Sequence, residues 1–357
     1  MPELDTVASS PVASDTAPAP PTAPQGTRKT KIGIGGVVWP LAALALLLLF
    51  NLVFTPGFFN LTIRDGHLYG VPVDILNRGS QVMLLALGMT LVIATGGVDL
   101  SVGAIMAIAG AVAAQLIQGP SGFVVAVGVA LLCAVLAGTW NGTLVGVVGL
   151  QPIVATLILM VAGRGVAQLI TGGQIVTFTD ERLSFIGNGH LLGLPFPVIM
   201  ALAMFGLTAL LTRKTALGLF VESVGDNETA SRYVGLHSGR IKLLTYVFSG
   251  FCAGLAGLAA TANIRGADAN NVGLFLELDA ILAVVIGGTA LTGGRFSLVG
   301  SILGALFIQT LTTTMYMQNV SAEVAPLPKA IVIIAVCLLQ SEAFRQTMSS
   351  RMKRRSA

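Results

Sequence analysis

Long apolar runs, separated by short polar or glycine-rich stretches, dominate the chain from residue 33 onward. Each run approaches the roughly 20 residues that a helix needs to cross a hydrocarbon core about 30 Å thick. Backbone polar groups in lipid need internal partners, so the runs predict helices. They lie at residues 33–53, 73–95, 99–118, 121–148, 152–171, 195–212, 241–263, 277–291, 296–316 and 326–341. The pattern predicts an all-α polytopic membrane protein with about ten transmembrane helices.

Composition supports this prediction and adds close helix packing to it. Of the 357 residues 54% are hydrophobic and only 10% are charged, which is incompatible with a water-facing surface. Small residues let helices approach closely in lipid, and glycines recur here at a spacing of four. The spaced glycines are Gly138, Gly142 and Gly146, then Gly250 with Gly254, and Gly300 with Gly304.

The positions of the basic residues predict the topology. The cytoplasmic loops and flanks of membrane proteins carry an excess of Lys and Arg. Basic residues gather in the N-terminal flank at Arg28, Lys29 and Lys31, in the loop 213–242 and in the tail after Arg345. Both termini are therefore expected in the cytoplasm. A signal peptide is the alternative for the first run, but the run is long and no small-residue cleavage site follows it.

Three segments follow from this topology. Residues 1–32 are rich in Pro, Ala, Ser and Thr and predict a disordered cytoplasmic tail with a basic flank. Residues 33–342 form the transmembrane domain, which includes the cytoplasmic loop 213–242. Residues 343–357 form a basic cytoplasmic tail.

Several kinds of chemistry are missing from the sequence. No lysine follows a glycine, so the phosphate-binding loop of many ATPases is absent. The three histidines are isolated, the three cysteines have no metal-ligand spacing, and no nucleophile elbow occurs. The net charge of +4 comes from helix ends and tails, not from a stripe that nucleic acid would bind. We expect no catalytic residue and no metal site.

The loop 213–242 contains an amphipathic stretch from Phe220 to Leu236. Asn227 can cap a short helix, Glu228 suits its N-terminus and Gly235 can end it. A helix from about Glu222 to Gly235 is expected. From these residues alone, a helix resting on the membrane and a helix seated in a partner protein are both open.

This stretch resembles the coupling segment of the ribose-type ABC sugar permeases, whose pattern runs A-V-G-x-N-x-x-A-A-x-x-x-G. Ser223 and Ser231 replace two of the alanines. The motif G-G-x-D-L-S-x-G of that family is present at 96–103, and E-L-D-A-I-x-A-V-x-x-G-G runs from Glu277 to Gly288. The runs 158–168 and 264–271 resemble the permeases of galactofuranose transporters. The resemblance covers about residues 36–342.

The resemblance implies a ten-helix subunit of a bacterial inner-membrane importer for galactofuranose or a related monosaccharide. It implies three partners: a cytoplasmic ATPase with tandem nucleotide-binding domains, a periplasmic sugar-binding protein, and a second permease, with a heterodimer favoured over a homodimer. ATP and Mg would be bound by the ATPase, with no cofactor in this chain. The implied coupling residues are Glu222, Val224, Gly225, Asn227, Ala230, Arg232 and Gly235.

Polar residues inside the runs are candidates for the pathway because such groups are costly in lipid. Asp99 and Ser101 either cap the helix that follows or form a cytoplasmic gate. Arg164 either pairs with a carboxylate such as Asp279, reaches toward the outer interface, or faces a cavity where its donors suit sugar hydroxyls.

Two further groups complete the candidates. Trp140 and Asn141 together offer ring and amide contacts of the kind sugars use, although Asn141 would equally bridge two helices. Arg265, Asp268, Asn270 and Asn271 lie in a predicted outer loop and are expected to contact the binding protein.

Two other classes of protein remain open at this point. An ion-coupled secondary sugar transporter also needs about ten helices and carboxylates along its pathway. A channel or a structural membrane subunit would also show glycine packing and few polar residues. Residues 96–103 and 293–300 are similar in sequence, which is compatible with duplicated halves of the chain or with chance.

Overall fold

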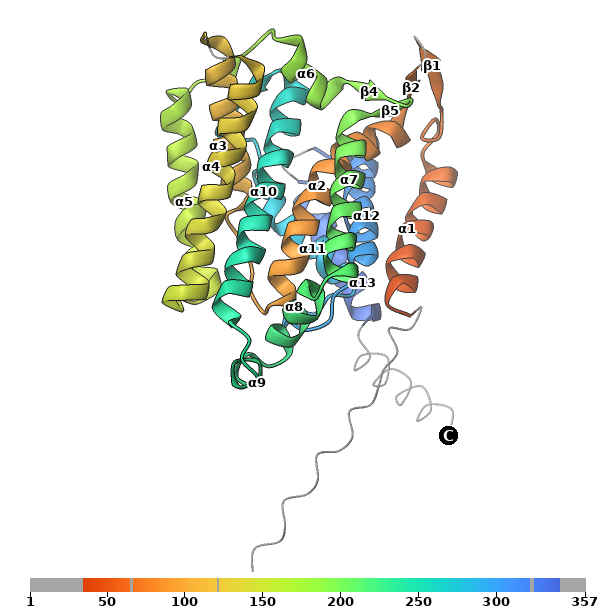
Figure 1. Cartoon of the computed structure of the whole chain (residues 1–357). Coiled ribbons are helices and arrows are strands. Elements are labelled where there is room, and N and C mark those ends of the chain that lie inside the picture. The colour runs from red at the N-terminus through yellow and green to blue at the C-terminus, as the bar shows by residue number, and fades with distance from the viewer. Residues whose placement is uncertain (1–34, 65–66, 121, 322–323, 341–357) are drawn as a thin grey trace, which may run out of the picture. The chain divides into compact units, whose positions relative to one another are not determined.

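Helices make up most of the structure, a computed structural model that describes residues 35–64, 67–120, 122–321 and 324–340 (Figure 1). The predicted tails 1–32 and 343–357 lie outside the described residues. The helices are α1 (Gly35–Phe54), α2 (Val71–Ala94), α3 (Val102–Gln118), α4 (Phe123–Thr143) with a π-helical turn (Leu144–Val148), α5 (Pro152–Thr171), α6 (Glu181–Asn188), α7 (Phe196–Lys214), α8 (Leu217–Asp226), α9 (Glu228–Tyr233), α10 (Ser238–Ile264), α11 (Leu276–Ile286), α12 (Leu298–Met317) and α13 (Pro326–Gln340). The strands are β1 (Thr62–Arg64), β2 (His67–Tyr69), β3 (Val176–Thr177), β4 (His190–Leu191), β5 (Leu194–Pro195) and β6 (Gly266–Ala267).

Each predicted apolar run contains a helix, but the helices differ in length. Seven helices in the described residues are long and apolar enough to cross a membrane: α1, α2, α4 with its π-helical turn, α5, α7, α10 and α12. The helix α3 and the Pro326–Val336 part of α13 are shorter apolar helices, and α11 has only 11 residues. The seven spans confirm a polytopic helical protein, whereas ten crossings and cytoplasmic termini stay predictions.

Three long helices form the centre of the bundle. The apolar stretches of α2, α10 and α12 are mostly buried, whereas only a minority of the residues in those of α1, α4, α5 and α7 are buried. The helix α10 packs against α4, α2 and α3, and α12 packs against α2, α11 and α1. Exposed apolar side chains on the peripheral helices are what a lipid or a partner surface would cover.

The glycine spacing serves close helix contacts, as predicted. A Cβ atom added to Gly138 would lie 2.5 Å from the carbonyl oxygen of Tyr246 on α10, and one added to Gly250 would lie 2.6 Å from the carbonyl oxygen of Ala134 on α4. Added Cβ atoms at Gly300 and Gly304 would overlap the backbone of Gly287 and Ala283. These helices approach each other at distances that only glycine permits.

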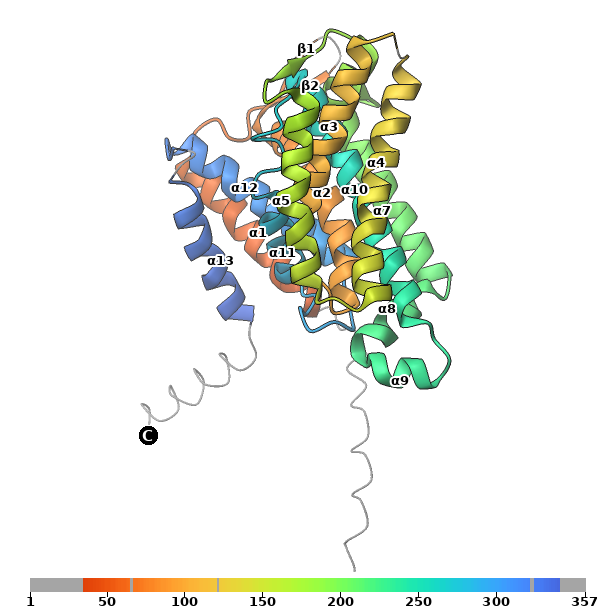
Figure 2. The same cartoon turned by 90° about the vertical axis from the view of Figure 1, so that its left-hand side faces the viewer.

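The bundle has two distinct ends (Figures 1 and 2). We call the end that carries α8 and α9 the coupling end; the turns between α2 and α3 and between α11 and α12 also lie there. The opposite end, the hairpin end, carries α6 and three antiparallel strand pairs, β1 with β2, β4 with β5, and β3 with β6. The first residue of α1 and the last of α13 both lie toward the coupling end, as the predicted topology requires.

Two non-helical segments lead into the short helices. Residues 95–101 precede α3, and residues 268–275 precede α11. They meet where α3 begins, because an added Cβ atom at Gly103 would overlap the carbonyl oxygen of Gly273. Gly273 itself has φ +73°, which favours glycine.

Candidate functional site

A buried polar cluster around Asp99 joins three parts of the bundle. Asp99 is fully buried, and its Oδ1 accepts hydrogen bonds from the backbone nitrogen of Ser101 (3.1 Å), Ser101 Oγ (2.6 Å) and Asn141 Nδ2 (3.5 Å). Its Oδ2 accepts one from Ser249 Oγ on α10 (2.9 Å). Asn141 on α4 also donates to Ser101 Oγ (2.7 Å). The cluster therefore connects segment 95–101 with α4 and α10.

The structure shows how Asp99 and Ser101, the candidates for a helix cap or a gate, lie at the start of α3. Ser101 stands at the N-cap of α3, but its side chain makes no capping hydrogen bond; Asp99 accepts from the backbone there instead. Asn141 bridges helices, as one alternative proposed. Trp140 lies on the outer face of α4 and is 57% exposed. The expectation that Trp140 and Asn141 form one contact site is wrong within this subunit, because consecutive helical residues point in different directions.

Arg164 stabilises the segment that precedes α11. Its Nη1 donates to the carbonyl oxygens of Ala269 (3.1 Å) and Val272 (2.5 Å). Asp279 instead forms an ion pair with Nζ of Lys329 on α13, at 2.5 Å. The predicted pair between Arg164 and Asp279 is therefore wrong. The guanidinium satisfies carbonyl groups that no helix pairs, which non-helical backbone at membrane depth requires.

Glu277 is a buried carboxylate that the sequence analysis treated only as part of a motif. Its Oε2 lies 2.5 Å from where a Cβ atom of Gly103 would be, at the first turn of α3. No hydrogen bond to Oε2 exists within the described residues. The positive end of the α3 dipole favours a carboxylate at this position. An acidic residue at the start of an apolar run was the signal in the sequence.

A polar cavity of about 420 Å³ opens in the half of the bundle nearer the hairpin end. Its polar lining comes from α2 (Arg78, Gln81), the end of α10 (Asn263), the segment before α11 (Asp268, Asn271) and α12 (Gln309, Thr312, Tyr316). Sequence analysis missed the residues of α2 and α12. Their signal was helical spacing, with Arg78 and Gln81 three residues apart and Gln309, Thr312 and Tyr316 on one face.

The four residues predicted to contact a binding protein divide into two groups. Asp268 and Asn271 line the cavity, and Asp268 Oδ2 accepts a hydrogen bond from Asn271 Nδ2 (2.7 Å). Asn270 is exposed and accepts from Gln168 Nε2 (2.7 Å), while Arg265 is exposed at the end of α10. Asn270 and Arg265 lie outside the cavity, and Asn271, which lines it, is exposed as well.

At the coupling end, the predicted helix from Glu222 to Gly235 is two helices. Asn227 lies between α8 and α9 with extended backbone, φ −155°, so a single helix is wrong. Its capping role is confirmed, because Asn227 Oδ1 accepts a hydrogen bond from the backbone nitrogen of Ala230 (2.9 Å). Gly235 follows α9 with φ +88°. The cap ends one helix and starts the next at an angle.

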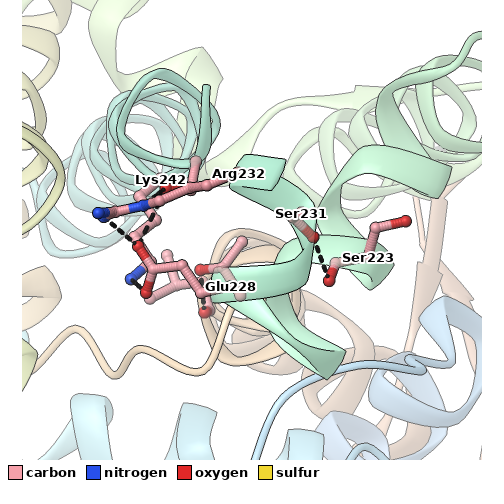
Figure 3. A network of polar contacts seen from close by, with 8 residues as sticks. Ser223, Glu228, Ser231, Arg232 and Lys242 are labelled. Atoms are coloured by element: carbon pink, nitrogen blue, oxygen red, sulfur yellow. Dashed lines mark hydrogen bonds and ion pairs between the residues drawn. The ribbon is translucent and has the colours of Figure 1, made fainter. Parts of the chain in front are cut away.

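Glu228 attaches α9 to the start of α10 (Figure 3). Its Oε1 accepts from Arg232 Nη2 (2.7 Å) and Ser238 Oγ (3.0 Å), and its Oε2 accepts from Lys242 Nζ (2.6 Å). Burial by itself raises the pKa of Glu228. The hydrogen bond and charge of Lys242, with the hydrogen bonds from Ser238 and Arg232, outweigh it and hold the pKa below its ordinary value of 4.5.

The helix α8 is seated on the bundle through small and apolar side chains. Val221 and Val224 are buried against Ala94 and Ile241. An added Cβ atom on Gly225 would overlap the carbonyl oxygen of Ala94, so α8 touches the end of α2 directly.

Gly225 also lies next to the two glycine turns, at 96–97 and 293–294, whose sequences resemble each other. An added Cβ atom on Gly293 would lie 2.8 Å from the carbonyl oxygen of Gly225 and 2.9 Å from the backbone nitrogen of Gly96. Gly294 donates its backbone N–H to the carbonyl oxygen of Ala94 (2.9 Å). One short helix therefore touches both turns, the one before α3 and the one before α12.

Two large apolar side chains are exposed at the end of α9, a feature that sequence analysis missed. The side chain of Tyr233 is 88% exposed and that of Val234 is 77% exposed. Of the other predicted coupling residues, Glu222 is half-buried and Ala230 and Arg232 are exposed. Exposed apolar side chains rimmed by charged ones are typical of a protein contact surface.

Comparison with known proteins identifies the family of this chain. Residues 71–339 match the family model described as branched-chain amino acid transport system / permease component. The galactofuranose transporter permease protein YtfT of Escherichia coli is 54% identical over 86% of this chain and 91% of its own length. The fructose import permease protein FruF of Bifidobacterium longum is 40% identical over 92% of this chain and 93% of its own. The ribose import permease protein RbsC of Escherichia coli is 36% identical, over 84% and 92%. The chain therefore belongs to the branched-chain amino acid transport system / permease component family, and it is a multi-pass permease subunit of the inner membrane.

Proposed function

We propose that this chain is the permease subunit of an ATP-binding-cassette importer that carries a monosaccharide, galactofuranose or a related sugar, across the inner membrane. One observation carries the proposal: 54% identity to a galactofuranose transporter permease across 86% of this chain. The fructose and ribose import permeases match over similar spans, which favours a monosaccharide in general. Nothing among these relatives supports the ion-coupled alternative.

The proposal includes partners that supply energy and substrate. The chain has no phosphate-binding loop, so ATP and Mg are expected in a separate cytoplasmic ATPase with tandem nucleotide-binding domains. A periplasmic binding protein would deliver the sugar to the hairpin end, where Arg265 and Asn270 are exposed. A second permease would complete the pathway, and we favour a different chain over a second copy. The exposed Trp140 reaches a sugar only if such a neighbour covers the outer face of α4.

The contacts at the coupling end suggest how force passes into the bundle. The ATPase would hold α9 at Tyr233 and Val234, and ATP binding would favour one state by interacting differently with the two. Glu228 attaches α9 to α10. The helix α10 carries Ser249, which donates to the buried Asp99. In this mechanism the Asp99 cluster is the gate, and α10 connects it to the ATPase.

A reconstitution assay tests the proposal. Proteoliposomes containing the permease, its ATPase and its binding protein are offered radiolabelled D-galactose, D-ribose, D-fructose and L-leucine, with and without ATP. We expect uptake of one or more sugars that requires both ATP and the binding protein. Uptake of L-leucine alone would move the substrate class to that named in the family description. Uptake by this chain without ATP would support an ion-coupled transporter.

A further inference from the structure

The polar cavity near the hairpin end holds hydrogen-bonding groups that the protein leaves unused. Within the described residues, the side chains of Arg78, Gln81 and Asn263 make no hydrogen bond, although all three line the cavity. Gln309 has only a long contact to Thr313 Oγ1, at 3.4 Å. Amide and guanidinium groups facing a cavity without partners are poised for a ligand or for water.

We infer that this cavity is the site where the permease itself binds the monosaccharide, and that Gln81 and Gln309 recognise its hydroxyl groups. The inference rests on the proposed function, because it assigns a binding site to the transported sugar within this chain. Its volume of about 420 Å³ falls in the range of small-molecule pockets, roughly 300–1,000 Å³.

The chemistry of the lining matches a neutral polyol. Each sugar hydroxyl is both a donor and an acceptor, and each glutamine or asparagine amide offers both functions in return. The charges of Arg78 and Asp268 are opposite, so the cavity carries no net charge that would select an ion. Tyr316 and Leu274 add apolar surface for the C–H faces of a sugar ring.

A second cavity provides the contrast. A pocket of about 320 Å³ lies nearer the coupling end and is lined by Leu91, Leu211, Leu244, Phe248 and Phe251 among others. Its lining is almost wholly apolar, so a polyol entering it would lose its hydrogen bonds to water without replacement. The polar cavity is the one that fits a sugar.

The position of the polar cavity links it to the proposed gate. Gly273 lines the cavity and also contacts Gly103 at the first turn of α3. Asn271 lies in the same segment, which Arg164 stabilises through its carbonyl groups. A sugar bound by Asn271 would therefore act on segment 268–275, which leads into α11 and contacts the start of α3.

The test uses matched glutamine variants in the reconstituted complex. Gln81→Leu and Gln309→Leu keep the approximate side-chain size and remove the amide. Gln115→Leu is the control, because Gln115 is exposed on α3 and does not line the cavity. For the sugar that the wild-type complex takes up, we expect the concentration for half-maximal uptake to rise about tenfold in each cavity variant, as loss of a hydrogen bond predicts. The control should match the wild type.

Sugar analogues lacking one hydroxyl give a second readout that misfolding cannot imitate. In wild type, one monodeoxy analogue should compete about tenfold more weakly than the parent sugar. In the variant that has lost the partner of that hydroxyl, the analogue and the parent should compete equally. Equal discrimination by wild type and both cavity variants would overturn the inference, as would unchanged uptake kinetics.

A third readout separates the sugar site from a docking role and from failure of the proposed function. Stimulation of ATP hydrolysis by the sugar-loaded binding protein should stay within about twofold of wild type in both variants, since the proposed docking residues Arg265 and Asn270 are unchanged. Loss of stimulation together with unchanged sugar discrimination would make the cavity a docking surface and overturn the inference. Failure of the wild-type complex to import any sugar would instead reject the proposed function.

Discussion

Asp279 and Lys329 form an ion pair between α11 and α13, and both side chains are largely shielded, with exposed fractions of 17% and 15%. Removing one member leaves the other charge without compensation, which typically costs about 3–5 kcal/mol. We expect Lys329→Met to lower the free energy of unfolding by about that amount. The double variant Lys329→Met with Asp279→Leu should recover most of the loss. SDS titration in mixed micelles measures both, and equal losses in the single and double variants would contradict the pairing.

Asp99 and Ser249 offer a second prediction at the scale of single residues. Their hydrogen bond is one of four that Asp99 accepts, and it is the contact to α10. If α10 drives the gate through this bond, Ser249→Ala and Asp99→Asn should each reduce ATP-driven uptake, and the double variant should lose little more. Such non-additivity is expected of residues in one network. Ser223→Ala is the control for loss of a serine hydroxyl, because Ser223 Oγ donates to the carbonyl oxygen of Leu219 within α8 and not to Asp99. Additive losses of uptake in the double variant would show that the two residues act independently, which would contradict the prediction.

Sequence reasoning identified Asp99, Asn141 and Arg164 as candidates but not the directions in which their side chains point. In lipid both the core side and the outer side of a helix are apolar, so periodicity carries little information about orientation. Trp140 and Asn141 are neighbours in sequence, yet one is exposed and the other fully buried. The partner of Arg164 was equally out of reach, because it is a pair of backbone carbonyls that no side-chain pattern reveals.

At the scale of elements, Gly225 is where α8 meets the bundle. A methyl group there would overlap the backbone of Ala94, and backbone cannot give way as a side chain can. We expect Gly225→Ala to displace α8 and to uncouple ATP hydrolysis from uptake. Gly206→Ala on α7 is the matched control: no atom lies within 4 Å of the added methyl, and a helical Gly→Ala change there gains roughly 0.5–1 kcal/mol. The ratio of ATP hydrolysed to sugar imported measures coupling. An unchanged ratio in Gly225→Ala would refute a role of α8 in coupling.

Glu228 tests whether α9 acts as a rigid extension of α10. Glu228→Gln removes the charge that holds Lys242 and Arg232, so we expect looser coupling and more ATP hydrolysed per sugar. Asp226→Asn, at the end of α8, is the control because it also removes one negative charge. The side chain of Asp226 makes no hydrogen bond or ion pair within the described residues, so this variant should leave the ratio unchanged.

The pH dependence of the same contact follows from the direction of the pKa shift. The folded-state pKa of Glu228 is depressed below 4.5, so its stabilisation is present above that value and is lost as pH falls through the folded pKa. Coupling in wild type should therefore hold down to about pH 5 on the cytoplasmic side. Loss of coupling already near pH 6, without a matching loss in Asp226→Asn, would contradict the assignment.

The elements show where sequence reasoning reached and where it stopped. Apolar run length located each of the long or apolar helices, because spanning lipid leaves few other solutions, but it missed the short polar helix α6. It extended the helix that begins near Glu277 to residue 291, whereas α11 ends at Ile286, because residues 287–291 are small or apolar and do not interrupt the run. It also merged α8 and α9, because Asn227 has the same capping chemistry whether one helix or two are present.

At the scale of the whole molecule, burial is unevenly distributed. The centre formed by α2, α10 and α12 is covered by neighbouring helices, whereas only a minority of the residues in the apolar stretches of α1, α4, α5 and α7 are buried. Lipid accounts for some of this surface. The proposed second permease would need to cover part of it, because the polar cavity and the Asp99 cluster do not by themselves connect the two ends.

The orientation of the whole bundle is the last prediction. Basic residues at the coupling end are Arg213, Lys214, Arg232, Arg240, Lys242 and Arg295, and those at the hairpin end include Arg64, Arg182 and Arg265. This excess predicts a cytoplasmic coupling end. With Cys133, Cys252 and Cys337 replaced by alanine, Tyr233→Cys should react with a membrane-impermeant maleimide only in inverted vesicles. Leu192→Cys, in the turn between β4 and β5 and 92% exposed, should react only in intact spheroplasts. The reverse pattern would place α8 and α9 outside the cell, away from ATP, and would remove the coupling mechanism together with the topology.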